Sequence, residues 1–368
     1  MIIGVPRELA DGECRVAIVP ESVGKLSKAG FEVVVQRGAG GASCFSDEAY
    51  EKAGARLVEA AEALGADIVL KVEQPTLDEA DHLKEGKAVF SLFEPWNSED
   101  LVAKLNSSKI TSFSMQLIPR ITRAQSMDVL SSQATISGYK AVLLAAERLP
   151  RILPMLVTAA GTLAPARALV IGAGVAGLMA IGTARRLGAI VEGFDVRLAA
   201  AEQVESMGAK FVGRELLEEG SEDAGGYAKA QSADKEAKIR EFIRGHVAGV
   251  QIVITTAAIP KRKAPILITE EAVKGMKPGS VIVDLAAESG GNCELTKVGE
   301  VVEAHGVTII GPRRLPATVP THASQMYSRN ITTLLLSLVK DGEFGLDFED
   351  EVVAAACVTH AGETRSAP

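Results

Sequence analysis

Three glycines, Gly172, Gly174 and Gly177, form a G-x-G-x-x-G pattern directly after the short apolar run Ala168–Ile171. In dinucleotide-binding folds the first glycine makes a tight turn. The second lets the main chain approach a pyrophosphate, and the third lets the next helix pack closely on the strand. A helix is expected to begin near Val175, and the N-terminal end of a helix favours a bound anion. The pattern predicts a dinucleotide-binding turn, with a purely structural glycine turn as the alternative.

An acid, Asp195, ends the next apolar run, Ile190–Phe194. It follows the glycines at roughly the 20-residue interval at which such folds place an acidic residue. A carboxylate there accepts hydrogen bonds from the ribose hydroxyls of NAD and repels the 2′-phosphate of NADP, so the sequence favours NAD. The cation of Arg197, two residues further on, could pair with that phosphate and weakens the preference.

A second segment, residues 119–133, gathers two arginines, two amides, an acid and several hydroxyls directly after an expected strand. Loops at the carboxyl ends of strands line the clefts of α/β proteins. Arg120, Gln125 and Asp128 have the chemistry to hydrogen-bond a carboxamide or a ribose. The alternative is a surface loop or helix cap with local pairing.

Charged residues near the N-terminus allow two interpretations. Arg7, Glu8, Arg15 and Glu21 are either functional or paired surface charges. Lys71 ends an apolar strand, where we expect a lysine to meet a ligand or an acid.

The polar, glycine-containing segment 214–236 places Tyr227 directly after Gly225 and Gly226. It is either a solvated loop or a lid that closes on bound nucleotide, with the glycines as hinges.

The composition excludes several classes of protein. A net charge of −8 and a pI near 5.4 argue against a nucleic-acid partner. No apolar stretch is long enough to insert in a membrane, and the N-terminus lacks a signal-peptide layout. The cysteines and histidines show no metal-ligand spacing, so we expect no metal site. The cysteines also form no disulfide framework, which favours a cytoplasmic location.

The length of 368 residues favours two domains. In the first we expect these strands: Ile2–Val5, Glu32–Gln36, Ile68–Val72, Ala88–Leu92 and Thr111–Ser114. Between them we expect these helices: Pro20–Ala29, Ser46–Ala53, Leu57–Leu64 and Ser98–Leu105, the last with Ser98 as N-cap.

After a helix over Ser137–Leu149, six strands are expected in the order 3-2-1-4-5-6: Ala168–Ile171, Ile190–Phe194, Lys210–Val212, Gln251–Thr255, Ser280–Asp284 and Val307–Ile310. A helix over Ala323–Lys340 and the tail from Val352 are expected to return to the first domain. The predicted fold is two Rossmann-like, doubly wound parallel-sheet α/β domains with a cleft between them. The first domain comprises residues 1–130 and 322–368, and the second, residues 131–321, binds NAD.

Several motifs indicate a family: Gly4-Val5-Pro6-Arg7-Glu8, Arg15-Val16-Ala17, Lys71-Val72, the G-A-G-V-A-G turn and residues 276–284. The whole chain resembles the NAD(H)-binding domain I, or α1 subunit, of proton-translocating NAD(P) transhydrogenase. It is similar, more distantly, to alanine dehydrogenase. Alanine dehydrogenase needs an acid/base histidine and an aspartate, and here Glu94 and Glu288 stand near those places. The loop R-I-T-R-A-Q-S-M-D from Arg120 matches transhydrogenase instead.

The resemblance implies which residues hold the cofactor, NAD(H). In the loop that contacts the nicotinamide half they are Arg120, Gln125, Ser126, Met127, Asp128 and Ser131, of which Gln125, Arg120 and Asp128 are the candidates for positioning the reaction. For the pyrophosphate and adenosine half they are Gly172, Gly174, Val175, Gly177, Asp195, Val196 and Arg197. The resemblance also assigns Gly226 and Tyr227 to a mobile loop and Ala258 to a main-chain position near the cofactor.

The resemblance further implies direct hydride transfer between NADH and NADP⁺ held on a partner subunit, coupled to proton translocation. The expected partners are an NADP(H)-binding subunit, a membrane-spanning subunit and a second copy of this chain. Through them we expect a cytoplasmic, peripheral place on the inner membrane. Two alternatives stay open: an alanine dehydrogenase-type amino-acid oxidoreductase, and a non-catalytic NAD-sensing module.

Overall fold

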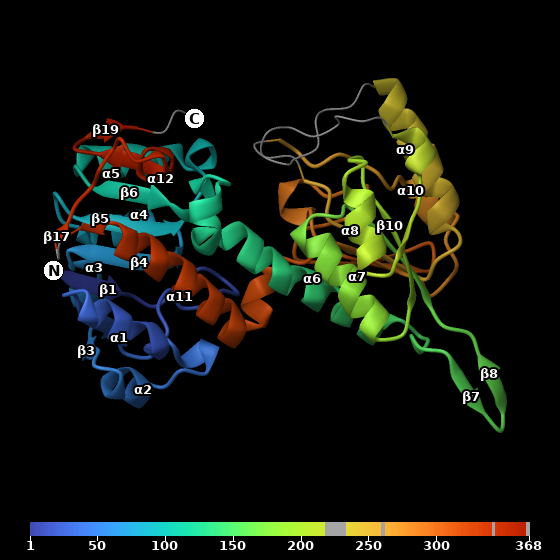
Figure 1. Ribbon diagram of the computed structural model, residues 1–368, viewed down its shortest axis with the longest axis horizontal. Coiled ribbons are helices and arrows are strands. Elements are labelled where there is room, and N and C mark those ends of the chain that lie inside the picture. The colour runs from blue at the N-terminus through green and yellow to red at the C-terminus, as the bar shows by residue number, and fades with distance from the viewer. Residues whose placement is uncertain (218–232, 259–261, 341–342, 366–368) are drawn as a thin grey trace. The chain divides into compact units, whose positions relative to one another are not determined.

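The computed structural model describes residues 1–217, 233–258, 262–340 and 343–365, and it divides into two compact units. Unit 1 comprises residues 1–133 and 316–368, and unit 2 comprises residues 134–315. Helix α6 (Val129–Arg148) runs from one unit into the other (Figure 1). The chain therefore leaves unit 1, builds unit 2 without interruption, and returns.

Unit 1 is built on a sheet whose parallel strands have the order β3-β2-β1-β4-β5-β6. Antiparallel strand β18 adds to β6, and β19 adds to β18. The strands are β1 (Ile2–Val5), β2 (Glu32–Gln36), β3 (Arg56–Val58), β4 (Ile68–Glu73), β5 (Ala88–Leu92), β6 (Thr111–Ser114), β18 (Cys357–His360) and β19 (Glu363–Thr364). Most are short apolar runs buried on both faces, as expected of a parallel sheet covered by helices.

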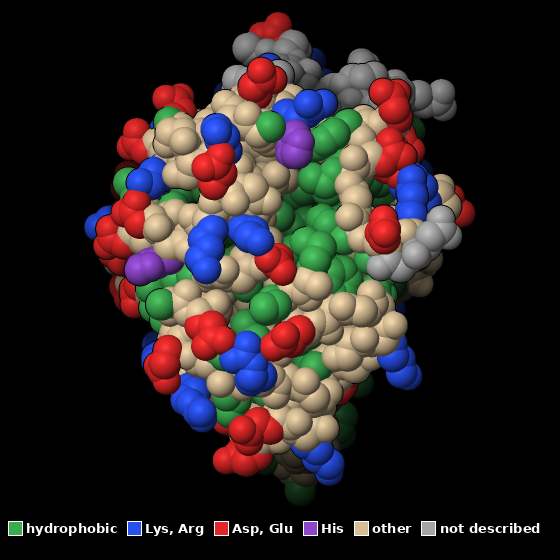
Figure 2. Space-filling model, turned by 90° about the vertical axis from the view of Figure 1, so that its left-hand side faces the viewer, with side chains coloured by type: hydrophobic (Ala, Val, Ile, Leu, Met, Phe, Trp, Pro, Cys, Tyr) green, Lys and Arg blue, Asp and Glu red, His purple; other side chains and the backbone are tan. Residues whose placement is uncertain are grey.

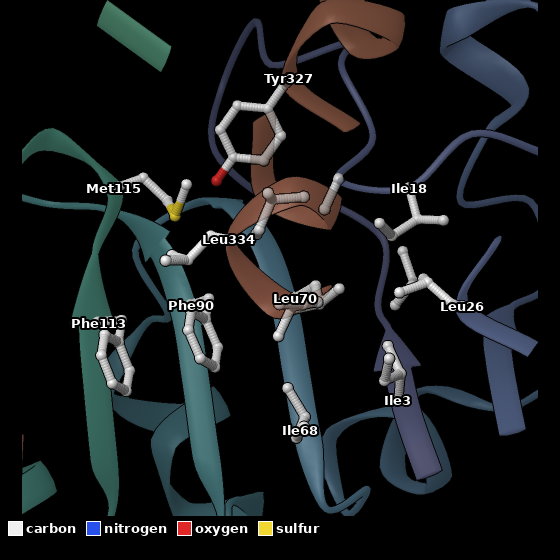
Figure 3. Packing of buried hydrophobic residues seen from close by; sticks show 14 of the residues in the cluster. Ile3, Ile18, Leu26, Ile68, Leu70, Phe90, Phe113, Met115, Tyr327 and Leu334 are labelled. Atoms are coloured by element: carbon white, nitrogen blue, oxygen red, sulfur yellow. The ribbon is translucent and has the colours of Figure 1, made fainter. Parts of the chain in front are cut away.

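Helices cover both faces of this sheet. They are α1 (Pro20–Lys28), α2 (Asp47–Lys52), α3 (Ala60–Leu64), α4 (Leu77–His82), α5 (Glu99–Ser107), α11 (Pro320–Ser337) and α12 (Glu351–Ala356). On one face Tyr327 and Leu334 of α11 pack over β4 and β5 (Figure 3). Beside them Phe90 and Phe113 stack with ring centroids 4.5 Å apart. The late helix α11 thus supplies part of the core of the N-terminal sheet.

Unit 2 repeats the same parallel order, β11-β10-β9-β12-β13-β15, with antiparallel β14 at the edge. The strands are β9 (Arg167–Ile171), β10 (Ile190–Phe194), β11 (Lys210–Phe211), β12 (Ile252–Thr255), β13 (Val281–Asp284), β14 (Val301–Ala304) and β15 (Val307–Ile310). The helices besides α6 are α7 (Val175–Arg186), α8 (Ala200–Ser206), α9 (Ala233–Val247) and α10 (Glu270–Lys274). The six parallel strands have the 3-2-1-4-5-6 order expected from the sequence.

Two small hairpins complete the chain. Strands β7 (Leu156–Thr158) and β8 (Gly161–Leu163) form a ribbon that extends away from the sheet of unit 2 (Figure 1). Strands β16 (Val339–Lys340) and β17 (Glu343–Phe344) come after α11 in unit 1.

Some sequence predictions need correction. The predicted helix over Leu57–Leu64 is wrong at its start, because Arg56–Val58 pairs with β2 as strand β3 and the helix begins only at Ala60. Helix α4 was not predicted. It is one short helix with a capping box in which Thr76 and Glu79 bond each other's main-chain N–H groups.

Two helix starts also differ from prediction. Helix α6 begins at Val129 rather than Ser137, because the carboxylate of Asp128 accepts the Ser131 N–H at 2.9 Å and caps the helix. Ser98 does occupy the N-cap position of α5. Its hydroxyl, however, donates to Gln74 Oε1 at 2.7 Å instead of capping the helix.

Candidate functional site

The register of unit 2 brings three loops to one edge of its sheet. Ile171 at the end of β9 pairs with Phe194 of β10 and with Thr255 of β12. The residues directly after these strands, Gly172, Asp195 and Thr256, therefore lie side by side at the carboxyl edge. The strand order reverses between β9 and β12, which is where open α/β sheets bind their ligands.

The glycine turn after β9 has the geometry that requires glycine at two of its positions. Gly172 has a φ of +95°, in the left-handed region. A Cβ on Gly172 would overlap the Thr256 hydroxyl, and a Cβ on Gly177 would overlap the carbonyl oxygen of Gly172. Gly172 thus lets the next loop approach, and Gly177 lets α7 pack against the turn.

Gly174 differs from both. It is exposed, it precedes the first residue of α7, and a Cβ placed on it would meet no atom within 4 Å. The first N–H groups of a helix lack partners within it, and they favour an anion. The structure therefore leaves the main chain of Gly174 uncovered at the start of α7.

Asp195 is buried and bound to the glycine turn. Its Oδ2 accepts the Ala173 N–H at 2.7 Å, and its Oδ1 accepts the Arg197 N–H at 2.8 Å. The Arg197 guanidinium also binds both carboxylate oxygens, at 2.9 and 2.8 Å. This pair fixes the carboxylate in place and offsets the charge of Arg197. Val196 lies half-buried between them.

The loop after β12 is held by residues that the sequence analysis did not identify. Asn292, fully buried, hydrogen-bonds both the N–H and the carbonyl of Ala257. Ala258, the next residue, is exposed. In the sequence Asn292 is marked only by its position after Gly290 and Gly291. Its contact with Ala257 could not be read from the sequence, because the two residues lie 35 positions apart.

The second group of predicted residues lies in unit 1, on the 3₁₀ segment Thr122–Met127, directly before it at Arg120, and at the start of α6. Ala124 and Met127 are buried and anchor this segment, whereas Arg120, Gln125 and Ser126 are exposed. The anchored backbone holds these polar side chains at the surface.

Local pairing occupies other members of this group. The Ser131 hydroxyl donates to Asp128 Oδ2 at 2.6 Å, so this pair closes the first turn of α6. Asn330 of α11 donates to the carbonyl of Ser126 at 2.8 Å. Arg123 pairs with Asp350 at 2.7 Å. These bonds tie the segment to the C-terminal portion of unit 1.

Unit 1 also contains a buried cluster of charges at the carboxyl ends of β1 and β4, which we call the charge cluster. Its members are Glu8, Glu13, Arg15, Lys71, Glu73 and Glu79. Lys71 Nζ binds Glu79 at 2.8 Å and Glu8 at 3.4 Å, with only 1% of the lysine side chain exposed. The expectation that Lys71 meets an acid is confirmed. Arg15 binds Glu13 at 2.6 Å and Gln133 at 2.9 Å.

Burial shifts the titration of this cluster. It raises the pKa of Glu8 to about 7, although the charge of Lys71 and the Val72 N–H act in the opposite direction. The pKa of Lys71 is raised because its two acidic partners outweigh the effect of burial. Four carboxyl groups thus surround two cations, with Glu73 partly exposed, and the burial of Glu8 favours a proton on its carboxylate.

The predicted lid falls largely on residues 218–232, so Gly226 and Tyr227 lie outside the described residues. Among the residues that the structure describes, no helix has the length and apolar character needed to cross a membrane.

Comparison with known families shows to which family this chain is related. The model for the alanine dehydrogenase/PNT N-terminal domain matches residues 4–137, and that for the C-terminal domain matches residues 141–367. The chain belongs to the alanine dehydrogenase/PNT family.

Within this family the chain is similar to transhydrogenase subunits. It is 47% identical to NAD(P) transhydrogenase subunit alpha of Haemophilus influenzae, with 99% of this chain and 71% of that protein covered. It is also 47% identical to an NAD(P) transhydrogenase alpha subunit of Rhodospirillum rubrum, with 98% and 97% covered. Alanine dehydrogenase of Mycolicibacterium smegmatis is more distant, at 28% identity over 100% of this chain and 95% of that protein.

Solved structures give the same ranking. Transhydrogenase from Sinorhizobium meliloti superposes with a TM-score of 0.90 at 45% identity, over 99% of this chain and 100% of that chain. An L-alanine dehydrogenase superposes with a TM-score of 0.84 at 26% identity, over 100% and 97%. The two-domain parallel-sheet fold predicted from the sequence is confirmed.

Proposed function

We propose that this chain is the NAD(H)-binding subunit of a proton-translocating transhydrogenase. It would bind NADH for direct hydride transfer to NADP⁺ held on a partner subunit. The observation that carries the proposal is the Gly172–Gly177 turn joined to the buried Asp195, in a chain 47% identical to transhydrogenase alpha subunits.

The residues of unit 2 fit the adenosine half of the dinucleotide. The open space at Gly174 and the start of α7, from Val175, would take the pyrophosphate. Asp195, held in place by the Ala173 N–H, would accept the ribose hydroxyls. Val196, Arg197, Gly226 and Tyr227 are proposed as further contacts to this half, and Ala258 as a main-chain position near the cofactor.

In unit 1, Gln125 and Arg120 would hold the carboxamide and ribose of the nicotinamide half, and Ser126, Met127, Asp128 and Ser131 would complete that loop. Bound NADH supplies the hydride. The task of the protein is to orient the rings and exclude water, and no proton donor is required.

The two acids near the acid/base places of alanine dehydrogenase have local partners. Glu94 accepts a hydrogen bond from the Asn97 side chain at 2.6 Å, and Glu288 accepts the Arg314 N–H at 3.1 Å. The presence of glutamates at both places, where alanine dehydrogenase needs a histidine and an aspartate, favours hydride transfer without acid/base chemistry over oxidation of an amino acid.

We propose that the partners are an NADP(H)-binding subunit and a membrane-spanning subunit, which would place this chain on the cytoplasmic face of the inner membrane. A second copy of the chain is also proposed. Residues 152–165 carry no charge, and the β7–β8 ribbon exposes Met155, Val157 and Leu163 to 60%, 72% and 55%. A two-stranded ribbon is only marginally stable alone in water, so we expect a second copy to cover it.

Replacing Gln125 by Asn tests the proposal. The shorter amide should slow hydride transfer, measured with the partner subunits added, at least tenfold, and should change the Kd for NADH by less than about threefold. Gln325→Asn, a change in a half-buried amide on α11, is the control. Equal losses of transfer and binding in Gln125→Asn would contradict the positioning role of Gln125.

Two further outcomes distinguish the alternatives. Formation of NADH from L-alanine by the chain alone, at ordinary enzyme rates, would show an alanine dehydrogenase. Binding of NADH without hydride transfer after addition of an NADP(H)-binding subunit would show a sensing module.

A further inference from the structure

Two loops at the carboxyl edge of unit 2 are joined by direct bonds. The Thr256 N–H donates to the Ile171 carbonyl at 2.8 Å, and the Thr256 hydroxyl donates to the Gly172 carbonyl at 3.0 Å. Because Gly172 has no side chain, Thr256 and Ala257 approach its α-carbon closely. The position of the loop after β12 is therefore set against the glycine turn.

One side chain fixes Ala257 in this loop. Asn292 Oδ1 accepts the Ala257 N–H at 3.0 Å, and Asn292 Nδ2 donates to the Ala257 carbonyl at 2.8 Å. The same Nδ2 donates to the Pro265 carbonyl at 2.9 Å. An amide is the neutral side-chain group that donates and accepts in this way, so neither Asp nor Leu could replace all three bonds.

Asn292 is itself held in place by Asp284. Its own N–H donates to Asp284 Oδ2 at 2.7 Å, and neither side chain is exposed. Asp284, at the end of β13, also accepts the Cys293 N–H at 3.0 Å and the hydroxyls of Thr255 and Thr296 at 2.9 and 2.7 Å. The support beneath Ala257 is thus a fully bonded, buried network with little freedom to move.

The topology assigns this loop to one half of a dinucleotide. A dinucleotide crosses such a sheet where the strand order reverses, here between β9 and β12. Asp195, at the end of β10, lies on the adenosine side, so the loop after β12 lies on the other. We infer that Asn292 is a positioning residue for the nicotinamide half, acting through the main chain of residues 256–258. This inference rests on the proposed function.

The experiment compares the affinities of the chain for NADH and for AMP, which represents the adenosine half alone. In Asn292→Ala, the Kd for NADH should rise about tenfold, the size expected for losing an oriented set of hydrogen bonds. The Kd for AMP should stay within about twofold. Loss of a merely structural residue would weaken both.

Two more variants complete the design. Thr256→Val removes the hydroxyl bond to the Gly172 carbonyl at a half-buried position, and we expect the same selective loss of affinity for NADH. This variant tests the inference even if Asn292→Ala fails to fold. Gln251→Ala is the matched control, because Gln251 is also a buried amide, and its Oε1 accepts the Arg167 N–H at 2.8 Å at the opposite edge of the sheet. It should leave both dissociation constants within about twofold.

The outcomes separate this inference from the function on which it rests. If the unaltered chain does not bind NADH, the proposed function fails. If it binds NADH but the Asn292→Ala and Thr256→Val variants keep their affinity, or lose NADH and AMP equally, the inference alone is overturned.

Discussion

The two sheets of this molecule share one order of six parallel strands but differ in the residues that come directly after the first strand of each. In unit 2, strand β9 leads into glycines, and the loop after β12 meets them through main-chain groups and the hydroxyl of Thr256. In unit 1, strand β1 leads to Glu8, whose carboxylate accepts the Val72 N–H at 2.6 Å at the end of β4.

The comparison shows that the same strand order can place different groups at the same position of a sheet. Both sheets reverse their strand order at the first strand, where a crevice is expected. In unit 1 the side chain of Glu8 reaches across this position, and the charge cluster lies around it. In unit 2 the same position keeps a main-chain surface with Gly174 exposed. Residue type at a few positions therefore decides whether this place in the sheet is occupied by a side chain or left as exposed main chain.

The charge cluster contrasts with the charges on the surface. Figure 2 shows one face of unit 1, where acidic and basic side chains are interspersed. Exposed pairs such as Arg56 with Glu62 contribute little to stability, because water screens them. Breaking a buried pair leaves a charge with no water to solvate it.

The largest effect is expected from Lys71→Met, which removes the cation between Glu8 and Glu79. The free energy of unfolding at pH 7 should fall by about 3–5 kcal/mol, the usual result of leaving buried acids without their partner. Urea-induced unfolding measures it. Lys87→Met, which breaks the half-exposed pair with Asp67, should cost less than about 1 kcal/mol. Similar losses in the two variants would remove the contrast between cluster and surface.

The next effect concerns pH. Burial raises the pKa of Glu8 from its ordinary value of 4.5 to about 7, so the folded chain keeps a proton that the unfolded chain releases in this range. The contribution of this proton to the free energy of unfolding is at its maximum below pH 4.5 and is lost as the pH rises through 7. It amounts to about 3 kcal/mol.

Glu8→Gln cannot titrate, so its free energy of unfolding should fall less than that of the unaltered chain between about pH 5 and 8. Urea unfolding at several pH values gives both curves. If they are parallel, Glu8 is ionised in the folded protein and the charge cluster holds no proton.

The smallest effect on stability is expected in unit 2. In Gly177→Ala the new methyl group would overlap the Gly172 carbonyl, and the resulting shift of α7 should cost about 1–3 kcal/mol. Gly174→Ala meets no neighbour and should unfold like the unaltered chain, yet it should bind NADH more weakly. Unchanged NADH affinity in Gly174→Ala would show that the ligand does not approach this position.

Much of the fold could be predicted from the sequence, because continuous apolar runs bounded by polar residues specify buried strands. The bounds of β1, β2, β5 and β10 agree with prediction to the residue. The edge strands β3 and β14 were missed, as were β18, β19 and the hairpin strands β7, β8, β16 and β17. β3 has only three residues, and both β3 and β14 are stabilised by their neighbours rather than by their own sequence.

The candidate site also has a part that could be predicted from the sequence and a part that could not. The positive φ of the turn at Gly172 and the close packing of Gly177 on the Gly172 carbonyl result from a local motif, whereas the approach of Thr256 to Gly172 joins residues 84 positions apart. The clamp of Asn292 on Ala257 and the bond of Glu8 to Val72 could not be predicted. They join residues 35 and 64 positions apart, and only the folded sheet brings these together.

The return of the chain to unit 1 has a consequence for the order of folding during synthesis. The hydroxyls of Ser112 and Thr359 bond at 2.7 Å across 247 residues, and α11 covers a sheet made roughly 250 residues earlier. Unit 2 is continuous and can close its core as it leaves the ribosome. The sheet of unit 1, whose strands from β1 to β6 precede unit 2 in the chain, must wait with one apolar face uncovered until residues 316–368 emerge. Of the two units, the one whose sheet is made earlier is therefore the one completed later.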